Sequence, residues 1–193
     1  MGANLGDADA TLAAGVRALA ALPGGRLRAV SRLYATEPVG VVDQPTFRNA
    51  VVALDVPGGP DAATGATALL IALKQLERAF GRQRRARWGP RELDLDLLVF
   101  GRARLSIDRP PDGLSLDPGK ADRLLVVPHR DAGGRLFVLA PLSDIAAGLR
   151  PPGWRETVAT AVRRRRLAEG PTAVRPIATW DPARSTWQSL PEA

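Results

Sequence analysis

The chain has 193 residues, 45% of them hydrophobic and 24% charged, which is an ordinary composition for a globular protein with one core. The absence of cysteine from the sequence excludes disulfides, thiolate metal sites and a cysteine nucleophile. The net charge of +7 favours anionic partners, although charge alone does not separate nucleotides from nucleic acid. Without a long apolar run or a leader-like start, the sequence predicts neither a membrane span nor a signal peptide, and we expect a cytoplasmic protein.

Helical and strand patterns alternate in the first half of the chain. Residues 8–22 place apolar side chains at helical spacing, and a second helix is predicted over residues 61–80. Between them, residues 26–35 and residues 49–56 are rich in apolar side chains and predict two strands. The Pro-, Gly- and Asp-containing residues 36–46 predict a loop between these strands.

The second half of the chain is less regular. Residues 102–123 are polar and carry several Pro and Gly turns, so we expect a long, mobile connection there. Residues 137–145 predict a short strand or turn followed by a helix of one or two turns. A basic helix is predicted over residues 155–169, and Trp180 and Trp187 flank an Asp-Pro-Ala-Arg turn that predicts a terminal hairpin.

The most informative segment runs from Arg84 to Asp96. Several arginines lead into a run in which Asp94 and Asp96 alternate with leucines, at the period of a strand with one buried face. Two acids spaced in this way project from the same face, about 7 Å apart. Mg²⁺ takes oxygen ligands and shares them with substrate phosphates, and arginines pair with phosphate oxygens. The segment predicts a magnesium–nucleotide site, and an ordinary strand with one solvated face accounts for the same pattern.

The order of the predicted elements is helix, strand, strand, helix, strand, which indicates an α+β fold. One further strand in front would complete β-α-β-β-α-β, the ferredoxin-like arrangement. We therefore predict a ferredoxin-like α+β sandwich over residues 1–150, with its first strand missing from this chain. Residues 151–193 are predicted to form a C-terminal extension that packs on the same domain, and we expect a monomer.

Six segments, in order along the chain, resemble the 6-hydroxymethyl-7,8-dihydropterin pyrophosphokinases, a family of folate biosynthesis. The most diagnostic is the run Arg87-Trp88-Gly89-Pro90-Arg91-Glu92-Leu93-Asp94-Leu95-Asp96. A second, Gly2-Ala3-Asn4-Leu5-Gly6-Asp7, is similar to the segment with which the family opens. The other four lie within residues 31–40, 43–51, 77–84 and 128–142.

The resemblance implies a transfer of pyrophosphate from ATP to the hydroxymethyl oxygen of a reduced pterin, with attack on the β-phosphorus and release of AMP. It implies that Asp94 and Asp96 are metal ligands that hold two Mg²⁺ ions against the phosphates. Arg82 and Arg91 would contact phosphate and stabilise developing charge. These four residues are the predicted catalytic residues.

The resemblance also implies a pocket for the flat pterin, which two aromatic rings can sandwich while an amide reads its edge. Phe47 and Phe137 resemble the stacking pair, and Asn49 resembles the edge reader. Taken alone, the two phenylalanines are more often core residues, and Asn49 is more often a turn or cap residue. The predicted pterin-binding residues are Thr36, Val39, Phe47, Asn49, Trp88 and Phe137.

A third set of positions resembles the nucleotide contacts of the family: Lys74, Glu77, Arg84, Leu97, His129 and Arg135. Taken alone, Glu77 would be a solvent-facing helix residue, and a lone histidine after a proline is more often structural than functional. By resemblance, His129 would donate to an oxygen of the triphosphate, so its protonation would matter near neutral pH.

The chain departs from the family pattern at its start and after His129. The family opens with a strand before the segment that begins here at Gly2, and this strand is absent. Either the true start lies upstream, which we favour, or a C-terminal segment within residues 171–190 fills the slot. After His129, the residues Arg130 and Asp131 stand where relatives carry others, which leaves the adenine-side contacts open.

Two alternatives stand beside the enzyme. A basic ferredoxin-like module would bind RNA, but such sheets stack bases on strand aromatics, whereas this chain offers the paired Asp94 and Asp96. An inactive relative of the enzyme is the other alternative, because a central strand is missing. We predict an enzyme whose partners are ATP and hydroxymethyl-dihydropterin, with neither nucleic acid nor membrane as a partner.

Overall fold

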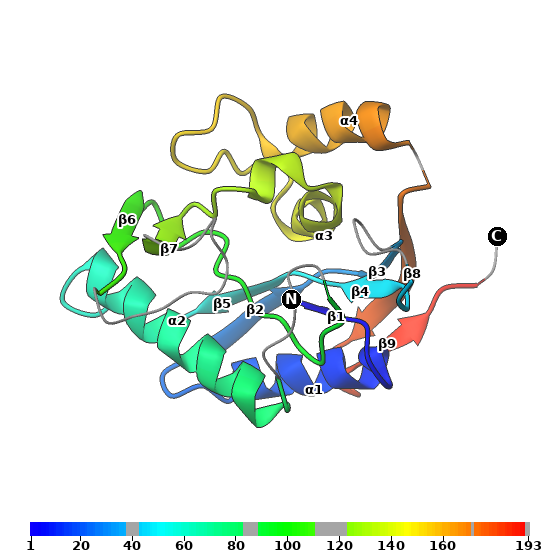
Figure 1. Cartoon of the computed structure of the whole chain (residues 1–193), viewed down its shortest axis with the longest axis horizontal. Coiled ribbons are helices and arrows are strands. Elements are labelled where there is room, and N and C mark those ends of the chain that lie inside the picture. Colours follow the sequence, from blue (N-terminus) through cyan, green and yellow to red (C-terminus); the bar gives the residue numbers. More distant parts are fainter. Residues whose placement is uncertain (38–42, 83–88, 111–122, 171, 192–193) are drawn as a thin grey trace.

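Antiparallel strands and helices combine in an α+β arrangement, in which the sheet lies between two pairs of helices (Figure 1). The computed structural model describes residues 1–37, 43–82, 89–110, 123–170 and 172–191. No helix within those ranges is long and apolar enough to cross a membrane.

The largest sheet in the described part of the chain has five strands in the order β1-β4-β3-β8-β9, and each neighbouring pair is antiparallel. These strands are β1 (Gly2–Ala3), β4 (Phe47–Asn49), β3 (Leu33–Thr36), β8 (Val174–Asp181) and β9 (Thr186–Ser189). Two smaller antiparallel pairs join β2 (Arg26–Val30) to β5 (Val52–Asp55) and β6 (Leu105–Asp108) to β7 (Arg123–Val127). The predicted connection over 102–123 therefore contains β6 and the start of β7, and its residues 111–122 lie outside the description.

Each of the two strands predicted in the first half is divided in two. Ser31 separates β2 from β3, and its hydroxyl accepts the backbone N–H of Val51 at 2.9 Å. The Ser31 N–H donates in turn to the Val51 carbonyl, also at 2.9 Å. In a regular ladder the Val51 N–H would donate to a backbone carbonyl of the neighbouring strand. Here it donates to the Ser31 hydroxyl, so the β2–β5 pairing does not continue into the β3–β4 pairing.

The helices α1 (Ala8–Ala20) and α2 (Ala62–Ala79) lie on one side of the sheet (Figure 1). On the other side, α3 (Leu136–Ala146) lies next to the sheet and α4 (Val158–Glu169) packs on α3. The predicted N-termini of the first two are confirmed by caps, since the carboxylates of Asp7 and Asp61 accept helix N–H groups at 2.9 Å. Each pair of helices has its own apolar cluster, one around Leu12, Val16, Leu33, Leu73 and Leu93, the other around Tyr34, Leu136, Leu139, Val158 and Val174.

The helix α3 has 11 residues and is longer than the helix of one or two turns predicted within residues 137–145. Leu136, Leu139 and Leu142 are all buried in it, together with Pro141. A segment that is apolar on most sides lacks the amphipathic period from which helices are predicted. The basic helix predicted over residues 155–169 is confirmed as α4.

The predicted terminal hairpin is confirmed as β8 and β9. Trp180 and Trp187 face each other across it, with ring centroids 4.7 Å apart and planes at 71°. The Trp187 indole N–H donates to the Ser31 carbonyl at 3.2 Å and so attaches the hairpin to the boundary between β2 and β3. Residues beyond 150 therefore share a sheet and a core with the rest of the described chain.

The hairpin does not occupy the slot of a first strand. Because β8 pairs with β3 on the side away from β4, the C-terminal strands extend the opposite edge of the sheet from β1. The alternative that a segment within residues 171–190 takes the place of a first strand is therefore wrong. A hollow of about 510 Å³ lies between β5 and residues 95–101, and Met1 is part of its lining.

The segment that carries the two acids keeps the predicted alternation. Leu93, Leu95 and Leu97 are 0%, 2% and 8% exposed, whereas Asp94 and Asp96 are only half-buried. The leucines thus face the core and the acids face away from it, as a strand with one buried face requires.

The prediction that this segment forms a strand is wrong, because its described residues form only a single bridge, between Asp94 and Gly2. Gly2 and Asp94 exchange two backbone hydrogen bonds, of 2.9 and 2.8 Å. At the next residue the Leu95 N–H donates to Glu77 Oε1 at 2.7 Å, and the Leu95 carbonyl accepts from Lys74 Nζ at 3.0 Å. Two side chains of α2 therefore satisfy backbone groups that a neighbouring strand would otherwise engage.

Candidate functional site

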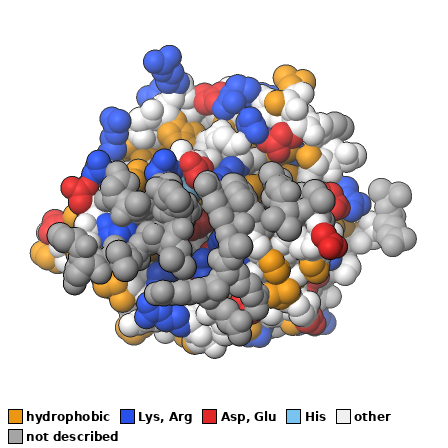
Figure 2. Space-filling model, viewed as in Figure 1, with side chains coloured by type: hydrophobic (Ala, Val, Ile, Leu, Met, Phe, Trp, Pro, Cys, Tyr) orange, Lys and Arg blue, Asp and Glu red, His pale blue; other side chains and the backbone are white. Residues whose placement is uncertain are grey.

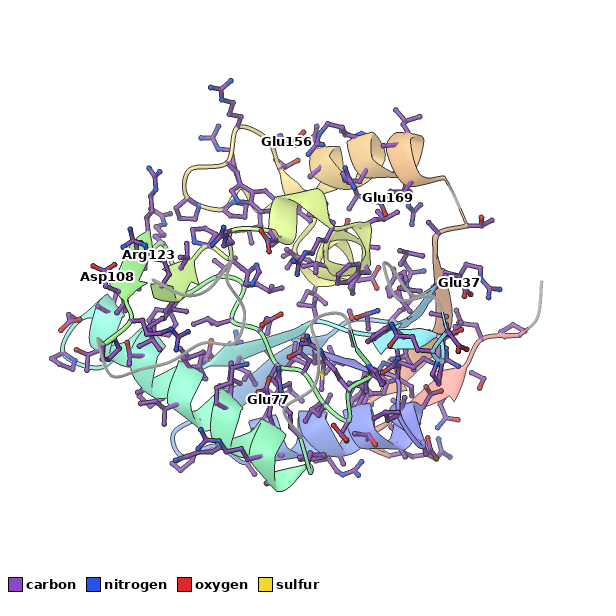
Figure 3. The ribbon with its side chains drawn as sticks, in the orientation of Figure 1. Glu37, Glu77, Asp108, Arg123, Glu156 and Glu169 are labelled. Carbon is purple, nitrogen blue, oxygen red and sulfur yellow. The ribbon has the colours of Figure 1, made fainter. Side chains whose placement is uncertain are left out.

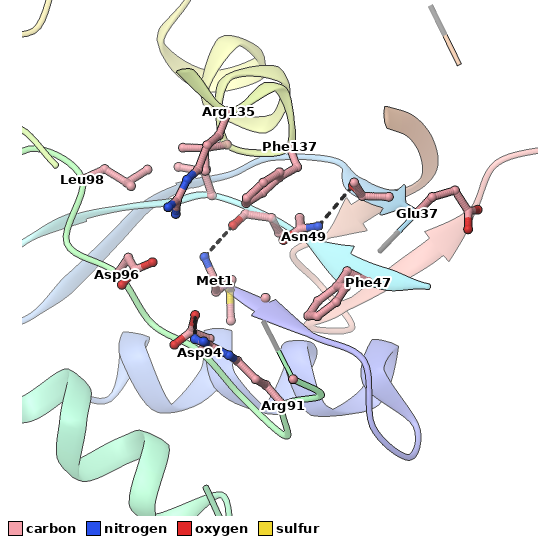
Figure 4. Close-up of a pocket in the computed structure, with 16 residues that line it drawn as sticks. Met1, Glu37, Phe47, Asn49, Arg91, Asp94, Asp96, Leu98, Arg135 and Phe137 are labelled. Atoms are coloured by element: carbon pink, nitrogen blue, oxygen red, sulfur yellow. Dashed lines mark hydrogen bonds and ion pairs between the residues drawn. The ribbon is translucent and has the colours of Figure 1, made fainter. Parts of the chain in front are cut away.

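A pocket opens between β1, β4, the start of α3 and the segment around residues 89–98 (Figure 4). Charged side chains from residues 91–96 line one part of it, and neutral side chains from β4 and α3 line another. We call these the acid half (Arg91, Asp94 and Asp96, backed by Arg82) and the aromatic half (Phe47, Asn49 and Phe137, with Thr36). The lining includes eight of the predicted site residues: Thr36, Phe47, Asn49, Arg91, Asp94, Asp96, Arg135 and Phe137.

Asp94 is the centre of the acid half. Its Oδ1 accepts from Arg82 Nη1 at 2.6 Å, and its Oδ2 accepts from Arg91 Nη1 at 2.5 Å. Burial alone would raise the pKa of Asp94, but the charges of Arg91, Arg82 and Lys74 outweigh that effect and hold the pKa below its usual range. The Asp94 carboxylate is therefore ionised at neutral pH, and both of its oxygens are engaged.

Asp96 differs from Asp94 in its surroundings. Figure 4 shows both carboxyl groups on the same side of the segment, facing the pocket. Among the described residues, no hydrogen bond or ion pair engages the Asp96 carboxylate. One acid of the pair is thus held by two arginines, while the other presents its oxygens to the pocket.

Glu77 supports the acid half from behind, on α2 (Figure 3). Its side chain is 2% exposed, and its Oε1 accepts from Lys74 Nζ at 2.7 Å and pairs with Arg82 Nη1 at 2.5 Å. Burial is the largest effect on the Glu77 carboxyl and raises its pKa, with Lys74 opposing the shift. Glu77 therefore fixes Arg82 and the Leu95 backbone with one carboxylate.

The aromatic half presents rings and an amide. Figure 4 shows Phe47 from β4 and Phe137 from the start of α3 on either side of Asn49, all three at the pocket. Asn49 is 8% exposed, and its Nδ2 donates to Thr36 Oγ1 at 3.2 Å. The antiparallel register pairs Thr36 with Phe47, so the strands themselves bring these residues together. A flat ligand with polar edge groups suits such a surface.

Arg135 joins the pocket from the side of α3, and His129 lies nearby in the chain without lining it. Arg135 Nη2 donates to Asp131 Oδ2 at 2.6 Å, and its guanidinium lies 5.9 Å from the centre of the Phe137 ring. The Asp131 N–H donates to His129 Nδ1 at 3.2 Å, so this nitrogen acts as an acceptor. The departure from the family pattern at Asp131 therefore anchors Arg135 next to the aromatic half.

Of the remaining predicted residues, some are described by the structure and do not line the pocket. Lys74, Glu77 and Arg82 form the layer behind Asp94. Leu97 lies in the core beside Leu95, and its neighbour Leu98 lines the pocket instead. The predictions for Val39, Arg84 and Trp88 fall on residues outside the described ranges.

Two residues near the chain start belong to the site although the sequence did not single them out. Gly2 lines the pocket and bridges to Asp94. Asn4 is 2% exposed, accepts the Arg91 N–H on Oδ1 at 2.7 Å and donates from Nδ2 to the Pro45 carbonyl at 3.0 Å. The place of both residues in the segment Gly2-Ala3-Asn4 that resembles the family opening was the available signal.

The donor set of the acid half suits a hard cation that also binds a substrate. In the described ranges, no three His, Cys, Asp or Glu side chains gather as a metal site. Asp94 and Asp96 therefore offer carboxylate oxygens but not a full coordination shell. Mg²⁺ is commonly bound in this way, with one or two carboxylates and the remaining ligands from phosphates and water.

Basic and acidic side chains are interspersed on the face seen in Figure 2. On the predicted basic helix α4, Arg164 pairs with Glu156 at 2.8 Å and Arg165 pairs with Glu169. These contacts agree with a solvated helix face, and α4 does not contribute to the lining of the pocket.

Comparisons with known proteins agree on one family. The model of the 7,8-dihydro-6-hydroxymethylpterin-pyrophosphokinase family matches residues 1–147. The chain is 41% identical over 155 residues to the 2-amino-4-hydroxy-6-hydroxymethyldihydropteridine pyrophosphokinase of Pseudomonas aeruginosa, covering 80% of this chain and 83% of that protein. It is 41% identical over 162 residues to the protein of the same name in Methylorubrum extorquens (84% and 88% covered), and 35% identical over 145 residues to that of Bacillus subtilis (75% and 74%).

The match extends from Met1 through the acid half to the end of α3, and it includes every described residue that lines the pocket. The chain therefore belongs to the 7,8-dihydro-6-hydroxymethylpterin-pyrophosphokinase family.

Proposed function

We propose that this chain transfers pyrophosphate from ATP to the hydroxymethyl group of 6-hydroxymethyl-7,8-dihydropterin, giving AMP and the pterin diphosphate. The observation that carries the proposal is the joining of two unlike halves in one pocket. The acid half supplies paired carboxylates and arginines for a triphosphate, and the aromatic half supplies rings and an amide for a flat heterocycle. The relatives are named for this reaction.

In this proposal Asp94 and Asp96 hold magnesium, as two ions bound with ATP. When bound, the cation neutralises charge on the phosphate oxygens and orients them for in-line displacement. The lowered pKa of Asp94 keeps that ligand ionised at neutral pH. Asp96 has no ion pair among the described residues, so its carboxylate oxygens can bind the cation without first breaking a contact.

Arg82 and Arg91 change partners when the substrate binds. In the ligand-free chain both guanidinium groups lie on Asp94. Triphosphate oxygens accept bidentate pairing from guanidinium groups, so an arriving nucleotide competes with Asp94 for both arginines. The arginines then hold the triphosphate while its β-phosphorus is attacked and AMP departs, which stabilises charge that develops in the transition state.

Phe47 and Phe137 stack on the two faces of the pterin, and Asn49 bonds its polar edge. The hydrogen bond from Asn49 to Thr36 fixes the amide before the ligand arrives, which reduces the entropy lost on binding. Val39 and Trp88 complete the proposed pterin set. Lys74, Glu77, Arg84, Leu97, His129 and Arg135 form the proposed nucleotide set, with Glu77 and Lys74 acting through the groups they fix.

We also infer that the fold is the ferredoxin-like form of the α+β class. Across the sheet, the segment that carries the Asp94 bridge lies next to β1, followed by β4 and then β3. Along the chain, α1 lies between β1 and β2, and α2 lies between β5 and the Asp94 segment. This order supports the β-α-β-β-α-β assignment, with β1 reduced to Gly2–Ala3. A monomeric state and a cytoplasmic location remain predictions, and light scattering of the purified chain tests the first.

Calorimetry and product analysis test the proposed function. The purified chain is titrated with a non-hydrolysable ATP analogue with and without Mg²⁺, and then with the pterin. We expect nucleotide binding that requires Mg²⁺, pterin binding that strengthens once the nucleotide is present, and AMP in equimolar amount to pterin diphosphate when ATP is supplied. Binding of both ligands without product would identify an inactive relative, and metal-independent binding of RNA instead of nucleotide would favour the RNA-binding module.

A further inference from the structure

Gly2 lies between the two halves of the pocket, hydrogen-bonded to Asp94 on one side and paired in register with β4 on the other. On one side its N–H donates to the Asp94 carbonyl at 2.9 Å, and its carbonyl accepts the Asp94 N–H at 2.8 Å. On the other side it is paired in register with Asn49 on β4. Its backbone therefore sets the spacing between a residue of the acid half and the amide of the aromatic half.

The absence of a side chain at Gly2 is also used. A Cβ added there would lie 3.0 Å from Asn49 Oδ1 and 3.7 Å from the Arg48 carbonyl oxygen. The first distance is shorter than ordinary van der Waals contact, so Asn49 would have to move. The backbone of Gly2 lies outside the left-handed region, so its conformation is open to any residue. The glycine is therefore required by its neighbour and not by its own φ angle.

We propose that Gly2 is a positioning residue, whose missing side chain lets the Asn49 amide lie in the pocket at a fixed place relative to Asp94. This inference rests on the proposed function, because it assigns Asn49 to the pterin edge. Both residues are held from several sides, since Gly2 is bonded to Asp94 and Asn49 is bonded to Thr36. A methyl group at position 2 therefore requires the Asn49 amide oxygen to shift by a few tenths of an ångström, and this shift displaces the amide from the position that its bond to Thr36 fixes.

The test is a double-mutant cycle on ligand binding with Gly2→Ala, Asn49→Ala and the combined variant. We expect Gly2→Ala to weaken pterin binding by about tenfold, the effect of one misplaced hydrogen bond, and to leave nucleotide binding within about twofold. In the Asn49→Ala background the same substitution should cost nothing further, because the crowded amide is gone. A cost of Gly2→Ala that persists without Asn49 would overturn the proposal.

Gly148→Ala is the matched control. Gly148 is exposed after α3, its φ lies outside the left-handed region, and a Cβ there meets no atom within 4 Å. This variant should bind both ligands as the parent does. If Gly148→Ala and Gly2→Ala weaken pterin binding equally, crowding of Asn49 is not the cause.

A measurement on the ligand-free chain separates this inference from the proposed function. The NMR signal of the Asn49 side-chain amide is assigned by its loss in Asn49→Ala. It should shift in Gly2→Ala and keep its position in Gly148→Ala. An unshifted signal overturns the inference even if the pterin binds, whereas a shifted signal in a chain that binds no pterin contradicts only the proposed function. If Gly2→Ala does not fold, the combined variant decides: recovery of folding identifies contact with Asn49 as the cause, and failure to recover rejects it.

Discussion

The acid half and the aromatic half of the pocket are organised by opposite means. In the acid half, Asp94 is held by ion pairs with Arg82 and Arg91, and Arg82 also pairs with the buried Glu77. In the aromatic half, neutral side chains are placed by strand register and by one hydrogen bond, from Asn49 to Thr36. Substitutions in the acid half should therefore disturb the charge balance and the stability of the fold, while substitutions in the aromatic half should change the affinity for the pterin.

The largest effect is expected from Asp96→Ala. The variant removes one of the paired carboxylates of the acid half, so turnover should fall by about 10³-fold or more, as when a pre-placed electrostatic group is lost. No ion pair is broken among the described residues, so the thermal midpoint should stay close to that of the parent. Steady-state kinetics and thermal unfolding check both parts, and near-normal turnover would show that the metal assignment is wrong.

Glu77→Ala should produce the largest loss of stability. Removing this buried carboxylate leaves Lys74, Arg82 and the Leu95 N–H without their shared acceptor, which costs about 3–5 kcal/mol in the free energy of unfolding. Glu77→Gln retains an acceptor for Leu95 and should lose less. The partly exposed pair of Glu156 and Arg164 provides the control, since Glu156→Ala should cost under about 1 kcal/mol. Denaturant titrations that rank Glu156→Ala above Glu77→Ala would contradict this view of the acid half.

Phe137→Ala tests the aromatic half. Losing one stacking ring should weaken pterin binding by about tenfold to a hundredfold, while nucleotide affinity changes much less. Because the Arg135 guanidinium lies over this ring, a small change in nucleotide affinity is expected as well. Calorimetry with each ligand separates the two effects. An equal loss of both affinities would place Phe137 in the core and remove the contrast between the halves.

The smallest effect is expected from the titration of Asp94, because it changes stability only in the acid range. Its pKa is lowered from 3.8 in the folded chain, so its contribution to stability is present above that value and is lost as the pH falls towards the lowered pKa. Asp94→Asn lacks this titration, so its free energy of unfolding should depend less on pH below about pH 4 than that of the parent. Denaturant titrations through the acid range measure the difference, and parallel curves for the two proteins would argue against the charged pairs.

The features that could be predicted from the sequence are those with a local cause. The alternation of Leu93, Leu95 and Leu97 with the two acids follows from the period of extended chain, and it holds although no ladder forms. The helix starts at Asp7 and Asp61 follow from side-chain capping. The candidate pocket residues came from the resemblance, and eight of them lie together around one pocket.

The features that could not be predicted depend on contacts between distant residues. Nothing local to Ser31 indicates that its hydroxyl will take the Val51 N–H and divide two strands. Likewise, the Leu95 backbone is satisfied by the side chains of Glu77 and Lys74, which belong to a helix. The crowding of Asn49 against Gly2 is visible only when β1 and β4 are placed side by side.

The attachment of the hairpin by Trp187 makes one part of the fold observable by fluorescence. Trp187 is 9% exposed and its indole N–H is bonded to Ser31, so its emission differs from that of a hydrated indole. Detachment of β8 and β9 would expose this ring and shift its emission to longer wavelength. The single-tryptophan protein that keeps only Trp187 would therefore reveal whether the last two strands leave the sheet before the rest of the chain unfolds.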